Sequence, residues 1–475
     1  MFKKVLLSEK NTDTLIGLYA GFVVAIVFIT EKIVHTAIVS VALGFVILCL
    51  SFKSNNKIFT VRFFVCLLLL IAWLSFYIWF SFSNVPKIVL KNSDISIIKG
   101  TMIKDSSYTR DGRSMYYVKL NSIENKQKGI KASAEGIVGI SMPHTAIKLR
   151  YGEQAVFYIY NYKNGTYRGY RLKRIKEPGF FIRLRSSLYD DILDRIMVLY
   201  KTDNSESAYY SRNLASMLLL ASSSIEENIK KDASLLGLAH IFALSGAHLV
   251  LIAAAVKGIL KLFLPPQAVS VFNTFILGIY VFIVGPLPSL IRAFIMFTLL
   301  DNFKELRPYA LFITVILQTL FFPYTITSIA FKLSYVCVWA LFTFNSIIAY
   351  SISYSSLRLF SPIIAASVTS VLFSSPISIR NFGYWSPLGI VLSPLVMLLC
   401  VFCMAGGVLN VLFCPSAIGA FLMKYSYIGI RFILDLFIKK APDFSWGAYA
   451  LLVVFSLMLF ALKLLLFNRI IGNKH

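Results

Sequence analysis

Long apolar runs alternate along the chain with one extended polar stretch. Near the amino terminus three runs, at about residues 14–30, 33–51 and 60–82, each approach the twenty or so apolar residues that cross a bilayer. From 233 to 467 we count seven or eight further apolar segments. The pattern predicts a polytopic α-helical membrane protein.

Prolines and glycines interrupt the later apolar segments. Such breaks free backbone groups that lipid cannot satisfy, so they are tolerated at membrane depth only where protein or a water-filled cavity surrounds them. We therefore expect broken helices around a conduit. The interruptions fall at Pro265, Pro266, Gly285, Pro286, Pro288, Pro323, Pro362, Pro376, Pro387 and Pro394.

The polar stretch, residues 84–185, contains short runs of alternating β-formers separated by turn residues, which predicts a small antiparallel barrel. Residues 183–200 then place apolar side chains on one helical face, a pattern typical of an interfacial helix. We accordingly divide the chain into four parts. These are a transmembrane anchor (1–83), a basic barrel domain (84–185), an interfacial amphipathic helix (186–208) and a second transmembrane domain (209–475).

Composition supports the membrane class and adds a strong positive charge. The chain is 57% hydrophobic and only 15% charged, and its formal net charge is +25. Residues 84–185 hold 20 Lys and Arg against 7 Asp and Glu. Because Lys3, Lys4 and Lys10 precede the first span, we place the amino terminus in the cytoplasm, and three crossings put the barrel outside. The charge favours a polyanion or anionic lipid as partner.

The sequence offers no pattern for a metal, a cofactor or a nucleotide. Its six cysteines all lie in apolar stretches, and Cys400 and Cys403 form a C-x-x-C without a second ligand pair. The five histidines are scattered, and no G-x-x-x-x-G-K-[ST] loop is present. We expect no cofactor, and any ATP-driven work must come from a partner.

Residues 237–249 place unusual polar groups in an apolar stretch: His240, Ser245, Gly246 and His248. Ionisable groups at membrane depth mark a pathway or a reactive site. An equally acceptable interpretation is that the histidines only join neighbouring helices. A third is an intramembrane serine hydrolase or protease, in which Ser245 is a nucleophile activated by a histidine.

Three cations lie in or beside apolar runs of the same region: Arg292, Lys332 and Arg380. An arginine at mid-bilayer costs about 2.5 to 3.5 kcal/mol on insertion scales, which an anionic or wet surrounding would offset. These side chains either line a path for an anion or reach to the interface.

In the barrel domain tyrosines alternate with cations, as in proteins that stack single-stranded bases and follow the phosphates. The alternative is that half of each run is core and the cations are a solvated surface. The candidate nucleic-acid contacts are Arg110, Arg113, Tyr116, Lys119, Lys148, Arg150, Lys163, Tyr167, Arg168, Arg171, Lys173 and Arg174.

Residues 237–249, Gly-Leu-Ala-His-Ile-Phe-Ala-Leu-Ser-Gly-Ala-His-Leu, resemble the signature of the ComEC family of competence proteins. Residues 288–293, Pro-Ser-Leu-Ile-Arg-Ala, look like its Pro-Ser-x-x-Arg-Ala motif, and the segments 323–335 and 376–394 look like its later proline motifs. Ala247, Lys332 and Ile390 depart from the family pattern. The chain shows no metallo-β-lactamase-like domain of the kind that many relatives carry at the carboxyl end.

The resemblance implies an OB-like periplasmic domain and an inner-membrane channel that moves single-stranded DNA from the periplasm to the cytoplasm in natural transformation. The channel-lining candidates are then His240, Ser245, Gly246, His248, Arg292, Lys332 and Arg380. Implied partners are single-stranded DNA, membrane lipids, a periplasmic DNA receptor, a separate nuclease, and a cytoplasmic motor or single-strand-binding protein. A lipid or polysaccharide exporter remains an alternative.

Overall fold

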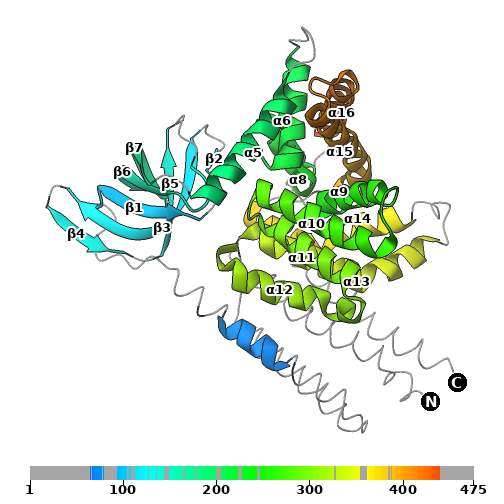
Figure 1. Cartoon of the computed structure of the whole chain (residues 1–475), viewed down its shortest axis with the longest axis horizontal. Coiled ribbons are helices and arrows are strands. Elements are labelled where there is room, and N and C mark those ends of the chain that lie inside the picture. Colours follow the sequence, from blue (N-terminus) through cyan, green and yellow to red (C-terminus); the bar gives the residue numbers. More distant parts are fainter. Residues whose placement is uncertain are drawn as a thin grey trace.

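The computed structural model shows a β-barrel and a bundle of helices, joined by one helix, α5 (Figure 1). It describes residues 65, 67–76, 79, 94–103, 106–108, 113–126, 128–134, 136–143, 149–163, 166–176, 179–198, 205–222, 227–242, 246–325, 328–353, 361–382, 386 and 388–438. The spans predicted at 14–30 and 33–51, and the part of the later apolar region beyond residue 438, lie outside these residues.

Five strands close the barrel. β1 pairs antiparallel with β3 on one side and with β6 on the other. β3 pairs with β5 and β6 with β7, also antiparallel, while β5 and β7 run parallel. A five-stranded Greek-key barrel is the architecture of the OB fold, so the predicted barrel is confirmed. The strands are β1 (Ile97–Met102), β2 (Ser107–Tyr108), β3 (Ser114–Asn125), β4 (Ile130–Ser133), β5 (Ile137–Met142), β6 (Gln154–Lys163) and β7 (Thr166–Lys176), of which β2 and β4 only extend the pairing of β3.

The barrel is built on alternation. Along β3 and β5 buried and half-buried positions alternate, because successive side chains of a strand point to opposite faces. Ile98, Val118, Ile140 and Phe157 fill the interior together with two tyrosines, Tyr116 and Tyr167. The outer face keeps the polar positions, which is where the basic residues of the domain accumulate.

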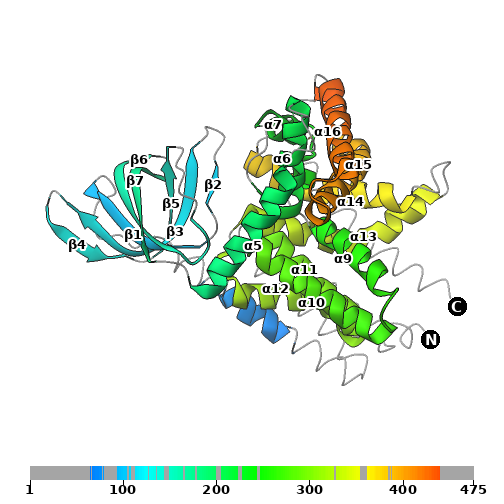
Figure 2. The same cartoon turned by 45° about the horizontal axis from the view of Figure 1, so that its top comes forward.

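The helical part contains α5 (Phe180–Met197), α6 (Glu206–Leu220), α7 (Glu227–Leu235), α8 (Ala239–Phe242), α9 (Gly246–Leu260), α10 (Pro266–Val284), α11 (Pro288–Asn302), α12 (Ala310–Phe321), α13 (Ile329–Ser353), α14 (Ser361–Phe382), α15 (Leu388–Leu412) and α16 (Ala417–Phe437), with 3-10 turns at Lys304–Tyr309 and Pro323–Thr325. In Figures 1 and 2 alike, α5 leads from the barrel into this bundle. α5 begins at Phe180, within the range assigned to the barrel from the sequence.

Four of the described helices are long and apolar enough to cross a membrane: Pro266–Val284, Ser361–Asn381, Leu388–Leu412 and Ala417–Phe437. Shorter apolar helices lie at Leu67–Phe76, Gly246–Leu260, Ala310–Phe321 and Ile329–Asn345. Large apolar side chains such as Phe275 on α10 and Phe421 on α16 face outward, as lipid contact requires. The protein is therefore a polytopic helical membrane protein that carries a small barrel.

The prolines act in two different ways. Pro266 and Pro288 start α10 and α11, where the missing N–H costs nothing. Pro376 and Pro394, in contrast, lie inside α14 and α15, so the interruptions expected there are wrong. At Pro376 the reason is visible. The carbonyl of Leu372, which loses its usual donor, accepts a hydrogen bond from Ser375 Oγ at 2.5 Å.

Candidate functional site

The segments that stood out in the sequence meet inside the bundle. The turn between α7 and α8 touches the start of α15, since a Cβ placed on Gly237 would lie 2.8 Å from the Ser386 carbonyl oxygen. A Cβ on Gly389 would in turn lie 3.1 Å from the carbonyl oxygen of Gly237. Two backbones thus approach each other directly, and the turn at Gly237 is packed against the segment that opens α15.

Gly246, the first residue of α9, packs against the guanidinium of Arg292 on α11. A Cβ at position 246 would lie 2.4 Å from Arg292 Nη2 and 3.1 Å from Ala293 Cβ, so a larger residue would displace the guanidinium. Arg292 is only 6% exposed. The structure therefore brings together two of the residues predicted for the pathway.

Gln318 on α12 ties these elements to the rest of the bundle, and the sequence offered no signal for it. Its amide Nε2 donates to the Pro288 carbonyl at 2.8 Å, at the first turn of α11. Its Oε1 accepts a hydrogen bond from the Tyr335 hydroxyl of α13 at 2.8 Å. One fully buried amide thus joins α11, α12 and α13, the helices that carry the Pro-Ser-x-x-Arg-Ala segment and the one after it.

The other predicted pathway residues have different surroundings. His248 is fully buried on α9. Lys332 is half-buried near the start of α13, and Arg380 is exposed in the last turn of α14. Ser245 and the side chain of His240 lie outside the described residues. Among the predicted pathway residues, the structure places Gly246 and Arg292 in contact.

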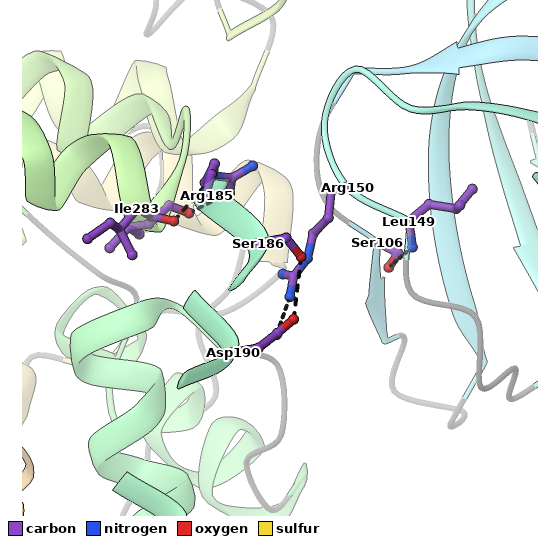
Figure 3. A network of polar contacts seen from close by, with 8 residues as sticks. Ser106, Leu149, Arg150, Arg185, Ser186, Asp190 and Ile283 are labelled. Atoms are coloured by element: carbon purple, nitrogen blue, oxygen red, sulfur yellow. Dashed lines mark hydrogen bonds and ion pairs between the residues drawn. The ribbon is translucent and has the colours of Figure 1, made fainter. Parts of the chain in front are cut away.

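The break between α10 and α11 is held by an arginine that the sequence analysis did not single out. Arg185 of α5 donates from Nε to the Ile283 carbonyl at 3.2 Å and from Nη2 to the Val284 carbonyl at 2.9 Å (Figure 3). A cation at a helix carboxyl end satisfies its last carbonyls and complements its dipole. Gly285 follows with φ of +103°, and its hydrogen side faces the same guanidinium.

Arg150 joins the barrel to α5. Its guanidinium forms an ion pair with Asp190 of α5 (Figure 3), with Nη2 2.7 Å from Asp190 Oδ1. The same guanidinium lies 4.5 Å from the centre of the Tyr189 ring. The side chain is 11% exposed. Arg150 was expected to contact nucleic acid, and in the structure its charge is engaged by Asp190 of α5.

The structure corrects the prediction that Tyr116 and Tyr167 contact nucleic acid. Both lie in the barrel core, where burial raises the pKa of Tyr167 to about 12. Their rings are out of reach of a base outside the barrel. The sequence showed that side chains alternate between the two faces of each strand, but not which of them face the core. Tyr116 and Tyr167 are among those that face the core.

One basic surface of the barrel lies on β3 and β5, which we call the β3–β5 face. The register places Met115 opposite Ser141 and Tyr117 opposite Gly139, with Lys119 at the exposed end of the row. Arg113 Nε donates to Ser141 Oγ at 2.9 Å, and Arg168 lies beside Ser141 on β7. In OB folds the face of the second and third barrel strands, which β3 and β5 are here, is a common ligand surface.

A second surface lies on β6 and β7, which we call the tyrosine face. Tyr160 and Tyr170 are 55% and 60% exposed, and their ring centres are 6.5 Å apart. Arg171 sits opposite Tyr158 in the register, 5.8 Å from that ring, and Lys173 is exposed on the same strand. Arg174 pairs with the buried Glu153 at 3.1 Å, and burial raises the pKa of this glutamate. Arg110, Lys148 and the side chain of Lys163 lie outside the described residues.

No group of His, Cys, Asp and Glu in the described part of the chain is arranged to hold a metal ion.

A protein-family model described as "Competence: Competence protein" matches residues 217–470. The matched range starts within α6 and ends beyond α16. It therefore includes the contacts of Gly237, Gly246, Arg292 and Gln318 described above, and it does not include the barrel. Neither a curated protein nor a solved structure matches the chain significantly.

Proposed function

Because this chain belongs to the ComEC family of competence proteins, we propose that it conducts single-stranded DNA across the cytoplasmic membrane into the cell. Membership supports a role in competence and DNA uptake. The channel, the strand and the direction of transport are our proposal, and the geometry of the bundle and the barrel supports each of them.

The observation that carries the proposal is the buried Arg292. It lies where two segments that resemble the family's motifs meet, the start of α9 at Gly246 and the first turns of α11. A DNA strand brings one negative charge per nucleotide, and hydrocarbon does not accept such charges. Passage therefore needs positive groups inside the bundle rather than on its lipid face. Arg292 lies inside, next to the first residue of α9, while the lipid-facing positions of α10 are apolar.

The orientation follows from the charges at the two ends of α10. Its carboxyl end lies at Arg185 and hence near the barrel, and its 19 residues put the other end about 28 Å away. The last turn of α9 and the connections at that far end hold Lys257, Lys261, Lys304 and Arg307, whereas the break at 285–287 holds no cation. By the positive-inside rule the far end is cytoplasmic, and the barrel lies outside, on the periplasmic side.

The barrel then collects the strand at the outer mouth. Exposed tyrosines and cations of the tyrosine face suit base stacking and phosphate contacts, and the β3–β5 face adds Arg113, Lys119 and Arg168. The channel needs no catalysis of its own. The DNA receptor that feeds it, the nuclease that removes the second strand and the cytoplasmic motor are separate proteins in this proposal.

The direct test is DNA uptake by cells whose own copy is replaced by an Arg292→Met variant. Removing the buried charge is expected to lower the number of transformants by about a hundredfold, from the 2.5 to 3.5 kcal/mol scale of a mid-membrane charge. Fluorescent DNA should still reach the outer side of the inner membrane. Arg307→Met, at an exposed cation of the far end, is the matched control and should transform normally. Normal transformation by Arg292→Met, with the protein inserted, would refute the proposal.

A further inference from the structure

Three arginines are buried in the described part of the helical region, and two of them have acceptors. Arg185 donates to the carbonyls of Ile283 and Val284. Arg212 donates to the carbonyls of Val198 and Ala208. Each of these guanidinium groups caps or clasps a neighbouring helix, so its burial is compensated within the protein.

Arg292 differs from both. No hydrogen bond or ion pair connects it to any described residue, and its Nε is buried without an acceptor. The described side chains that interact with it electrostatically are those of Tyr335 and Cys337, both neutral, and no described carboxylate is among them. A guanidinium does not lose its proton in a protein, and a buried charge without a counter-charge costs several kcal/mol. The position thus calls for an anionic ligand.

The amino end of α9 meets this guanidinium. Gly246 is the first residue of a helix of 15 residues, and its missing Cβ is what lets Arg292 Nη2 approach. The first N–H groups of a helix have no partner within the helix, and the helix dipole makes that end positive. Two independent features that attract an anion therefore lie at one point in the bundle.

We propose that Arg292 and the amino end of α9 form a binding site for a single phosphate of a phosphodiester. The planar fork of arginine suits two oxygens of one phosphate, and helix amino ends bind phosphate readily. That the phosphodiester belongs to a passing DNA strand rests on the proposed function. A lipid headgroup presents the same chemistry, so the experiment separates the two sources.

The probe is dimethyl phosphate, the smallest phosphodiester anion, added to the purified full-length chain in a maltoside detergent. A ligand that binds only the native state raises the unfolding temperature in proportion to the logarithm of its concentration above Kd. We expect such a rise over chloride at equal ionic strength. The rise should disappear in Arg292→Met and persist in Arg307→Met.

Two milder variants keep the test decisive should Arg292→Met fail to fold. Gly246→Ala places a methyl group where Nη2 lies, and Arg292→Lys keeps the charge without the fork. Each should weaken the probe about tenfold, the effect of losing one good charge-assisted contact. An equal rise in the wild type and the Arg292 variants, or no rise in the wild type, would overturn the proposal.

Competition identifies the source of the phosphodiester. Displacement of the probe by a short oligothymidylate, and not by short-chain phosphatidylglycerol, places the site on the DNA path. Displacement by the lipid alone leaves the phosphodiester site standing and removes it from the DNA path, which counts against the proposed function and not against the site.

Discussion

The barrel and the helical bundle solve opposite solvation problems with the same residue types. In the barrel the core is apolar and the cations lie on the outer face. In the bundle large apolar side chains face outward, Phe275 being 66% exposed, while Arg185, Arg212 and Arg292 are buried. The difference teaches that whether a cation is a candidate ligand contact depends on whether water or lipid surrounds its domain. An exposed cation of the barrel is a candidate contact, whereas in the bundle the candidate is the buried cation that lacks an acceptor.

The largest effect we predict concerns the joint between these two parts. Gly285→Ala puts a Cβ 2.1 Å from Arg185 Nη2 and forces a side chain onto a φ of +103°. We expect the free energy of unfolding of the full chain in detergent to fall by about 3 kcal/mol or more. Gly258→Ala on α9, where a Cβ meets nothing within 4 Å, is the matched control and should not lower stability, because alanine is the better helix former. Equal stability of the two variants would show that the break does not depend on Arg185.

A second effect, of intermediate size, separates the outer face of the barrel from its core. Replacing Tyr160 and Tyr170 with alanine should weaken oligothymidylate binding by about tenfold or more, since a base stacked on an aromatic ring is worth roughly 1 to 3 kcal/mol. Thermal unfolding should not change. Tyr209→Ala on α6, at a tyrosine that is 54% exposed, should leave binding intact. Undiminished binding in the double variant would move DNA capture to the β3–β5 face.

The smallest effect distinguishes two arginines of the barrel by the salt dependence of binding. Arg171→Gln should reduce the slope of log affinity against log salt by about 0.7, the value for one phosphate of a single strand. Arg150→Gln should leave the slope unchanged, because its guanidinium pairs with Asp190. If the two variants change the slope equally, Arg150 contacts DNA, and the claim that its pairing with Asp190 keeps it from doing so is wrong.

Several features of the fold could be predicted because they depend on local pattern. Alternation predicted a barrel, and apolar length predicted the described spans. The polar groups within the apolar stretch 237–249 pointed to the place in the bundle where the distant segments meet. The phase of a strand was not predictable, and for this reason Tyr116 and Tyr167 were wrongly assigned to the surface. The effect of a proline in mid-helix was not predictable either. The helix continues through Pro376 because the hydroxyl of Ser375 points to the Leu372 carbonyl, and the sequence does not report that orientation.

The site itself depends on contacts between residues far apart in the chain, which no local pattern reports. Arg185 bonds to Val284 across 99 positions, and Gln318 reaches Pro288 across 30. Arg292 could be singled out as a cation in an apolar run, but its lack of an acceptor is a property of the packed bundle. Arg150 shows the reverse case, because a basic residue in a basic domain was assigned to DNA and is instead engaged by α5.

The most direct test of the central claim, that DNA passes through the interior of the bundle beside Arg292, is to map what an entering strand touches. DNA that carries photoreactive thiothymidines and a bulky end group can be stalled during uptake, irradiated, and its cross-linked peptides identified. The account predicts cross-links to the inward residues of α9 and α11 around Gly246 and Arg292, and none to the outward Phe275 and Phe421. Cross-links confined to outward positions, or to other proteins while DNA still enters, would contradict it.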